Sequence, residues 1–249
     1  MGAGGFAAWT ARFEEERGRR AALGAPAWER GAALPGPVWD SVRRFQVGEA
    51  GDGANLIAKA DAAGDAGYAA AVRLFVAEEN HHAGLLAGLL AAGGEPLLAS
   101  HWSDRVFVRL RRLLGLRLEL LVLMIAEMVA LAYYRVLRDG TDDALTSEVA
   151  ARILADEHRH VPFHCARLHQ GMAPLPRPVR RPLLWTWRTA LLAVAWVIAL
   201  DHGPALRRLG TTRRMFIREV VAPSRRVTAS IITGAPLTPE PNATASAPR

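Results

Sequence analysis

The sequence contains very little cysteine and very little lysine. Cys165 is the single cysteine among 249 residues, and Lys59 is the single lysine. One thiol can form neither a disulfide within the chain nor a Cys-x-x-Cys iron site. The positive charge is carried almost wholly by arginine, which stays protonated in proteins.

The N-terminal segment lacks the features of a secretory signal. No basic segment followed by an apolar run precedes the acidic residues Glu14, Glu15 and Glu16. A signal peptide needs both features. We therefore expect a cytoplasmic protein, in a compartment where thiols stay reduced.

The composition favours a folded protein with a basic surface. Hydrophobic residues make up 51% of the chain, enough for the core of one large or two small domains, and the formal net charge is +7. Arginines occur in clusters, for example at positions 111–112, 180–181 and 213–214. Such clusters are either a solvated surface or a docking site for an acidic partner, such as an electron-transfer protein, a carrier protein or an anionic membrane. No recognition motif or aromatic stacking platform supports nucleic acid as the partner.

A Glu-x-x-His motif lies in a segment with the apolar spacing of a helix. Glu157 and His160 are three residues apart, which places both side chains on one helix face. Val149 and Ile153 lie on the same face, so a carboxylate and an imidazole occupy positions where apolar residues are expected. A single motif of this kind is more often a surface pair or a satisfied core histidine than a metal site.

The motif is repeated, together with a preceding carboxylate. Glu79 and His82 form a second Glu-x-x-His, and a glutamate lies 30 residues before each motif. The three residues of the first set recur 78 positions later in the second. The two sets are Glu49, Glu79 and His82, and Glu127, Glu157 and His160.

Across residues 38–171 this arrangement resembles the ferritin-like superfamily of di-iron carboxylate proteins, which includes rubrerythrins, acyl-carrier-protein desaturases and related di-iron oxygenases. The resemblance implies an all-α fold with an antiparallel four-helix bundle that holds two iron ions, or manganese in their place. The six residues of the two sets would be the ligands, and the four glutamates would take part in catalysis. A rubredoxin-like iron site, present in full rubrerythrins, is excluded because the chain has one cysteine.

The first two bundle helices are expected on either side of Asp65. The first covers Val38–Ala63 and contains three glycines near Glu49, each of which costs about 1 kcal/mol in a helix interior. This helix is either irregular beside Glu49 or closely approached by another backbone. Asp65 caps the second helix, which ends at Gly93.

The other two bundle helices are expected at Ser103–Arg138 and at residues 142–170, with Thr141 or Asp142 as the cap of the latter. Glu127 follows a run of apolar residues in the third helix. A carboxylate in such surroundings needs a cation or a hydrogen-bond partner, because an isolated buried charge is costly. Glu127 is therefore the strongest single ligand candidate.

A neighbouring pair, Glu78 and His81, has the same spacing as the motif but is not expected to bind metal. It lies about 100° from the apolar stripe of its helix. Its counterparts 78 positions later are Asp156 and Arg159, and arginine is not a metal ligand.

Helix four breaks the symmetry after its motif. Pro162 should bend the helix, and His164 lies one turn beyond His160, whereas the first half has Leu86 at the matching position. His164 is either an extra ligand, which would make one metal richer in nitrogen, or a residue that packs against and supports the site.

The bundle is flanked by an N-terminal arm (1–37), a C-terminal helical extension (172–234) and a disordered tail (235–249). Trp9, Phe13 and Trp28 could pack the arm onto the bundle. Residues 182–200 contain a single charge, Arg188. They are a fifth helix packed on the bundle, an interfacial membrane contact or a membrane span. A basic amphipathic helix is expected near residues 211–221.

The resemblance, taken with the basic surface and the C-terminal extension, implies a non-haem di-iron oxygenase or oxidase that activates dioxygen and oxidises an organic substrate. The substrate is a small molecule or is bound to a carrier, and a ferredoxin or a reductase supplies electrons. The alternatives are a rubrerythrin-like peroxidase or iron-handling protein, and a structural or membrane-associated protein with a vestigial site. An apolar cavity that reaches the metals would favour the first class, and a closed polar site the second.

Overall fold

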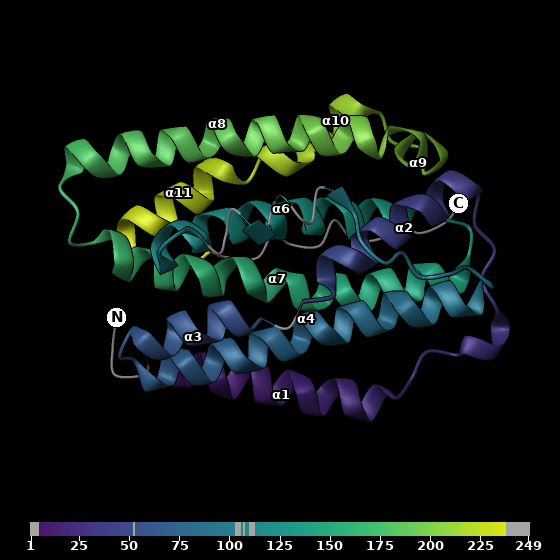
Figure 1. Cartoon of the computed structure of the whole chain (residues 1–249), viewed down its shortest axis with the longest axis horizontal. Helices are drawn as coiled ribbons and strands as arrows, with labels where there is room; N and C mark the ends of the chain where they lie inside the picture. Colours follow the sequence, from purple (N-terminus) through teal and green to yellow (C-terminus); the bar gives the residue numbers. More distant parts are fainter. Residues whose placement is uncertain (1–4, 52, 103–105, 107, 110–112, 238–249) are drawn as a thin grey trace, which may run out of the picture.

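The computed structural model describes residues 5–51, 53–102, 106, 108, 109 and 113–237, and every regular element among them is helical (Figure 1). The predicted all-α fold is confirmed. The elements are α1 (Ala7–Leu23), a 3-10 turn (Trp28–Arg30), α2 (Gly36–Glu49), α3 (Ala54–Ala62), α4 (Ala66–Ala92), α6 (Leu116–Gly140), α7 (Ala144–Met172), α8 (Arg177–Asp201), α9 (Gly203–Arg208), α10 (Arg213–Val221) and α11 (Ser224–Thr233).

The core lies among α2, α4, α6 and α7. The most extensive contact is between α6 and α7, and both α2 and α7 pack on α4. On one side α1 and α3 lie against α4, and on the other side α10 and α11 cover α6 and α7, with α8 outermost (Figure 1). The four central helices are those predicted to carry the two sets of candidate ligands.

The first predicted helix is interrupted after Glu49. α2 ends at Glu49 and α3 begins at Ala54, so a continuous helix over Val38–Ala63 is wrong, while the predicted irregularity beside Glu49 is confirmed. Gly53 has a φ of 61°, and a Cβ at this position would lie 2.4 Å from Cγ1 of Val76 in α4. Glycine is required here both by the left-handed backbone and by the close approach of α4.

Aspartates cap the two helices that carry the Glu-x-x-His motifs. Asp65 accepts a hydrogen bond from a backbone N–H of the first turn of α4 at 2.9 Å, as predicted. Asp143 does the same for α7 at 2.7 Å. The cap of α7 is therefore neither Thr141 nor Asp142, the two residues predicted.

The limits of α6 and α7 also differ from prediction. Gly115, which is extended, precedes α6, so the helix predicted over Ser103–Arg138 is not continuous at this point, and its predicted start lies outside the described residues. α7 continues through Pro162 as far as Met172.

The flanking segments are more helical than predicted. The arm contains α1, and Phe13 is buried, with Trp9 and Trp28 packed against the core as expected. The extension contains α8 over the segment predicted as a fifth helix, α10 where the basic helix was expected, and in addition α9 and α11. Most of the tail predicted to be disordered, residues 238–249, lies outside the described residues.

A buried polar network joins the extension to the bundle. Oγ of Ser41 in α2 donates a hydrogen bond to Tyr133 in α6 at 3.0 Å, and it lies 2.7 Å from Nδ1 of His202, between α8 and α9. Phe45 stacks on the Tyr133 ring with 3.5 Å between centroids. Three elements that are distant in sequence are thereby fixed to one another.

Stability should fall as His202 becomes protonated. Burial lowers the pKa of His202 to about 4, although Asp201 opposes this shift and Arg44 and His101 add to it. The unfolded chain, whose histidines titrate near pH 6.5, therefore binds more protons than the folded chain between pH 6.5 and pH 4. The contribution of His202 is full above pH 6.5 and is lost as the pH falls through this window, by about 2 kcal/mol between pH 7.5 and pH 5.

Urea unfolding of the wild type and His202→Gln at these two pH values measures the effect. Gln keeps a polar partner for Ser41 but does not titrate, so the variant should lose less stability than the wild type. Equal losses would show that His202 is not a buried neutral base.

Candidate metal centre

The six predicted ligands converge between the four central helices. Glu49 is the last residue of α2, α4 and α7 each present a Glu-x-x-His motif, and α6 provides Glu127. Their ligand atoms form two groups, in each of which all atoms lie within 4.8 Å of one another. The first group is Glu49, Glu79, His82 and Glu157, and the second is Glu79, Glu127, Glu157 and His160.

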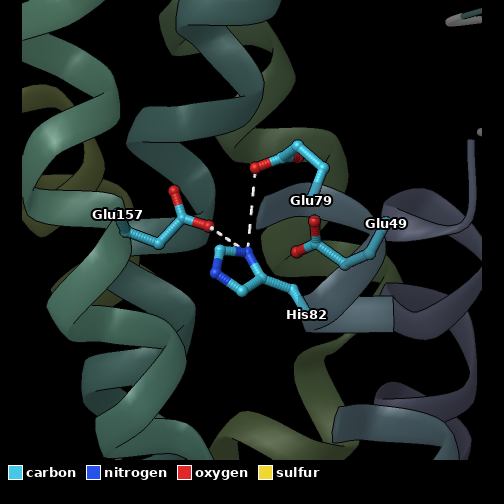
Figure 2. A group of neighbouring side chains, drawn as sticks. All are labelled: Glu49, Glu79, His82 and Glu157. Carbon is cyan, nitrogen blue, oxygen red and sulfur yellow. Dashed lines mark ion pairs between the residues drawn. The ribbon is translucent and has the colours of Figure 1, made fainter. Parts of the chain in front are cut away.

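Glu79 and Glu157 belong to both groups, so they lie at the middle of the site. Figure 2 shows the first group, with the side chains of α2, α4 and α7 directed toward a common point. Each end of the site has one further glutamate and one histidine, namely Glu49 with His82 and Glu127 with His160. A carboxylate has two oxygens and can contact two cations, so the two central glutamates are placed to bridge a pair of ions.

Both histidines direct Nδ1 into the site. Nδ1 of His160 lies 3.1 Å from Glu79, 3.2 Å from Glu127 and 3.4 Å from Glu157. Nδ1 of His82 lies 3.4 Å from Glu157 and 3.7 Å from Glu79. The carboxylates therefore surround these two nitrogens from three helices.

The site is closed on most sides. Five of the six predicted ligands are buried, and the side chain of Glu79 is 23% exposed. Buried atoms without a hydrogen-bond partner include Oε1 of Glu79, Nδ1 of His82 and Oε2 of Glu157. Unpaired buried polar atoms are costly, and all three of these point to a place where a cation would satisfy them.

Protons compete for the carboxylates of this site. Burial raises the pKa of Glu49 to about 8, and the charge of Glu79 adds to the shift. Burial also raises the pKa values of Glu79 and Glu157, which both face Glu127. Glu127 differs, because the hydrogen bond with His160 and the nearby imidazole of His164 outweigh burial and lower its pKa.

The histidines respond in the opposite direction. Burial by itself lowers the pKa of His82, but the hydrogen bond with Asp156 and the charge of Glu157 outweigh it and raise this pKa to about 10. Protons on the imidazoles and on some of the glutamates therefore offset the negative charge of the four carboxylates. Two divalent cations would carry the four positive charges that balance four ionised glutamates.

Each imidazole also contacts one further carboxylate, on the side away from the site. Nε2 of His82 lies 3.2 Å from Asp156, and Nε2 of His160 lies 3.0 Å from Glu78. The pairs are crossed, since each carboxylate directly precedes the motif of one helix and contacts the histidine of the other. An Nε2–H that donates to a carboxylate leaves the Nδ1 lone pair free for a metal and fixes the orientation of the ring.

Two arginines keep these outer carboxylates ionised. Arg20 of α1 and Arg159 of α7 each form ion pairs with both Glu78 and Asp156. Although burial opposes it, hydrogen bonding to the facing histidine lowers the pKa of each carboxylate, with the arginine charges adding to the effect at Asp156. Glu78 is outside both ligand groups, as predicted, but it contacts Nε2 of His160 and so contributes to the site.

The two ends of the site have different partners. The Tyr134 hydroxyl donates a 2.5 Å hydrogen bond to Glu49, whereas Nε2 of His164 lies 3.5 Å from Glu127. His164 is outside both ligand groups, and neither of its ring nitrogens has a hydrogen-bond partner. The structure places His164 behind Glu127 at one end and Tyr134 behind Glu49 at the other, so the site is asymmetric.

Sequence reasoning missed five contributors to the site: Arg20, Glu78, Tyr134, Asp156 and Arg159. A signal for two of them was present, because Glu78 and Asp156 are separated by the same 78 residues as the ligands. Tyr134 lies two turns after Glu127 on the same helix. Arg20 gave no signal, since its position depends on how α1 docks.

The residues fit two ions of iron or manganese. Each group offers three carboxylates and one imidazole, a mixed oxygen and nitrogen set that suits these metals, whereas structural zinc sites favour sulfur and nitrogen.

Comparison of the chain with models of protein families, with curated proteins and with solved structures finds no match.

Removing the charge of an outer carboxylate should weaken metal binding without removing a ligand. We expect Asp156→Asn and Glu78→Gln to lower the affinity for Fe²⁺ or Mn²⁺ about 10–100-fold, because the imidazoles lose their orienting partner. Glu127→Ala should abolish stoichiometric binding of two ions. Anaerobic titration against a competing chelator measures both effects.

Glu148→Gln is the matched control, because Glu148 is a partly exposed glutamate of α7 that pairs with Arg152. It should bind metal as the wild type does. Equal metal content in the wild type and Glu127→Ala would refute the ligand assignment. Unchanged affinity in Asp156→Asn would refute the orienting role.

His164→Leu tests the asymmetry, since leucine is the residue at the matching position of the first half. We expect the variant to keep two ions but to change the optical spectrum and the oxygen reaction of the loaded protein, because Glu127 loses its neighbour. Loss of one ion would make His164 a ligand. Unchanged metal content, spectrum and reaction would leave it as a packing residue.

Proposed function

We propose that this chain is a ferritin-like, non-haem di-iron (or manganese–iron) oxidoreductase that reacts with dioxygen and oxidises an organic substrate. The observation that carries the proposal is the pair of overlapping ligand groups that share Glu79 and Glu157. In this reading α2, α4, α6 and α7 are the four helices of a ferritin-like bundle. Two bound irons would supply the electron transfer and the Lewis acidity that protein side chains lack.

Each protein residue then has a distinct task. Glu79 and Glu157, which belong to both groups, would serve both ions, and the remaining glutamate and histidine at each end would hold one ion each. Glu78 and Asp156 hold the Nε2 protons of the histidines, so that both Nδ1 atoms stay available. The hydroxyl of Tyr134 donates to Glu49 and restrains that carboxylate where α2 ends.

A cavity beside the site suits the organic substrate. It measures about 530 Å³, within the usual range for small-molecule sites, and lies where α1 faces α4. Phe13, Trp28 and Leu85 give it apolar walls, while Arg20 and Arg152 add positive charge. Arg20 also contacts Glu78 and Asp156, so an anionic substrate bound here would lie against the residues that orient the histidines.

One observation favours the alternative of a rubrerythrin-like peroxidase or an iron-handling protein. None of the six ligands lines this cavity, and five of the six are buried. A site closed in this way admits small reactants, such as dioxygen, peroxide or Fe²⁺, beside Glu79. Reaction stoichiometry separates the two candidates.

The test begins with metal-free protein loaded anaerobically with two equivalents of Fe²⁺. Exposure to dioxygen should produce an optical change within seconds and consume oxygen, and Glu127→Ala should show neither, while Glu148→Gln behaves as the wild type. The proposal also expects oxygen consumption to rise when the substrate and an electron donor are supplied.

The alternatives give different results in the same experiment. A reaction with peroxide that is much faster than with dioxygen would identify a peroxidase. Oxidation and retention of iron far beyond two equivalents would identify an iron-handling protein. A loaded protein inert to both oxidants would refute oxidoreductase function.

A further inference from the structure

The outward face of α8 is apolar from Trp185 to Leu200. Trp185 is 67% exposed, Leu192 42%, Trp196 45% and Leu200 53%. These residues are spaced by seven, four and four positions, which places them on one side of a helix. Between Pro182 and Leu200 the single charge is Arg188, which is half-buried. The apolar strip from Trp185 to Leu200 therefore extends over about 22 Å, at 1.5 Å per residue.

The opposite face of α8 is already occupied. Leu184, Leu191 and Ala195 are buried, and the indole N–H of Trp187 donates a 2.7 Å hydrogen bond to the carbonyl of Leu121 in α6. α8 also packs on α10, and it forms the outermost layer of the molecule (Figure 1). The prediction of a helix packed on the bundle is confirmed for this face alone, and the other face is left to solvent.

The positive charge of the protein is concentrated in the same segment. Residues 177–233 contain eleven arginines but only two carboxylates, a net charge of +9, compared with +7 for the whole chain. The two carboxylates, Asp201 and Glu219, pair with Arg44 and Arg135 from outside the segment. No carboxylate of the segment remains to neutralise its own arginines, which cluster at positions 177, 180 and 181, at 207 and 208, and at 213 and 214.

We propose that the outward face of α8, with its flanking arginines, binds the surface of a bilayer that contains anionic lipids. An interfacial helix combines an apolar face that enters the boundary of the acyl chains with basic residues that meet the headgroups. Tryptophan is enriched at this depth because its ring is amphipathic. Each arginine near an anionic surface adds to the attraction.

Two other occupants fit the features less well. The first is a membrane span. Among the described residues, α6 and α8 both have the length and hydropathy that a span requires, but only α8 has its apolar window mostly exposed, with 28% of it buried. Spanning would place Arg188 at mid-helix in the lipid and draw in α10, which packs on α8 and carries Arg213, Arg214 and Arg218.

A second copy of the chain is disfavoured by charge. A two-fold contact through this face would bring the same surface patch of both subunits together. Each patch belongs to a segment of net charge +9, and like charges across an interface oppose association. An anionic lipid surface offers both the apolar layer and the opposite charge.

Vesicle flotation tests the proposal on the full chain without metal, so the result is independent of the metal centre. The wild type should float with vesicles of phosphatidylcholine and phosphatidylglycerol at low salt, and it should remain below vesicles of phosphatidylcholine alone. High salt should reduce the bound fraction. Trp196→Glu should weaken binding about tenfold or more, because a charge replaces an inserted ring.

Leu97→Glu is the matched control. Leu97 is 59% exposed and lies outside residues 177–233, so the variant adds the same charge elsewhere on the surface. It should bind vesicles as the wild type does. Trp196→Ala provides a milder change, and circular dichroism with thermal unfolding shows that each variant is folded.

Four outcomes would overturn the proposal. In the first, the wild type binds neither kind of vesicle, and in the second, Leu97→Glu loses as much binding as Trp196→Glu. In the third, the protein stays in the membrane after alkaline carbonate and therefore spans it. In the fourth, no vesicle binds, but the protein is a dimer that Trp196→Glu dissociates. The last outcome would assign the face to a second copy.

Discussion

The interaction on which the rest of the structure depends is the mutual repulsion of four carboxylates that lie close together between the central helices. The ligand atoms of Glu79 and Glu157 lie within 4.8 Å of those of the glutamate and the histidine at either end. The four carboxylates can therefore move apart only if the helices that carry them separate. Burial raises the pKa of three of the four glutamates, because ionisation of each is costly where little water is present. Protons or metal ions must supply the balancing charge, and the apolar packing of the four long helices holds the glutamates in place against their repulsion.

The outer layer of charge explains why α1 belongs to the site although it carries no ligand. Each imidazole is held between the central carboxylates on its Nδ1 side and an outer carboxylate on its Nε2 side. The outer carboxylates are themselves buried and adjacent, so they need neutralising charge of their own. Arg159 supplies it from within α7, and Arg20 supplies it from α1. The N-terminal helix is thus fixed by the same electrostatic requirement as the centre.

The sequence predicts those features that depend on residues close together along the chain. The helical periodicity, the Asp65 cap and the 78-residue repeat depend on neighbours along the chain, and they identified all six residues that converge. Glu78 was set aside as a ligand because it lies off the apolar stripe of α4, yet from there it reaches His160 of the facing helix. Arg20 and Tyr134 depend on how helices dock. Such contacts between distant segments leave no periodic trace in the sequence.

Two consecutive tyrosines connect the carboxylate centre to the C-terminal extension. Successive residues of a helix point about 100° apart, so Tyr133 and Tyr134 of α6 face different neighbours. Tyr133 meets Ser41 in the network that includes His202, while Tyr134 donates to Glu49. Any force that shifts the extension relative to α6 therefore acts on the helix turn that restrains Glu49. α6 is hydrogen-bonded to α8 through Trp187 and contributes Glu127 to the carboxylate centre, so attachment of the outward face of α8 to a surface would also fix the orientation of the centre.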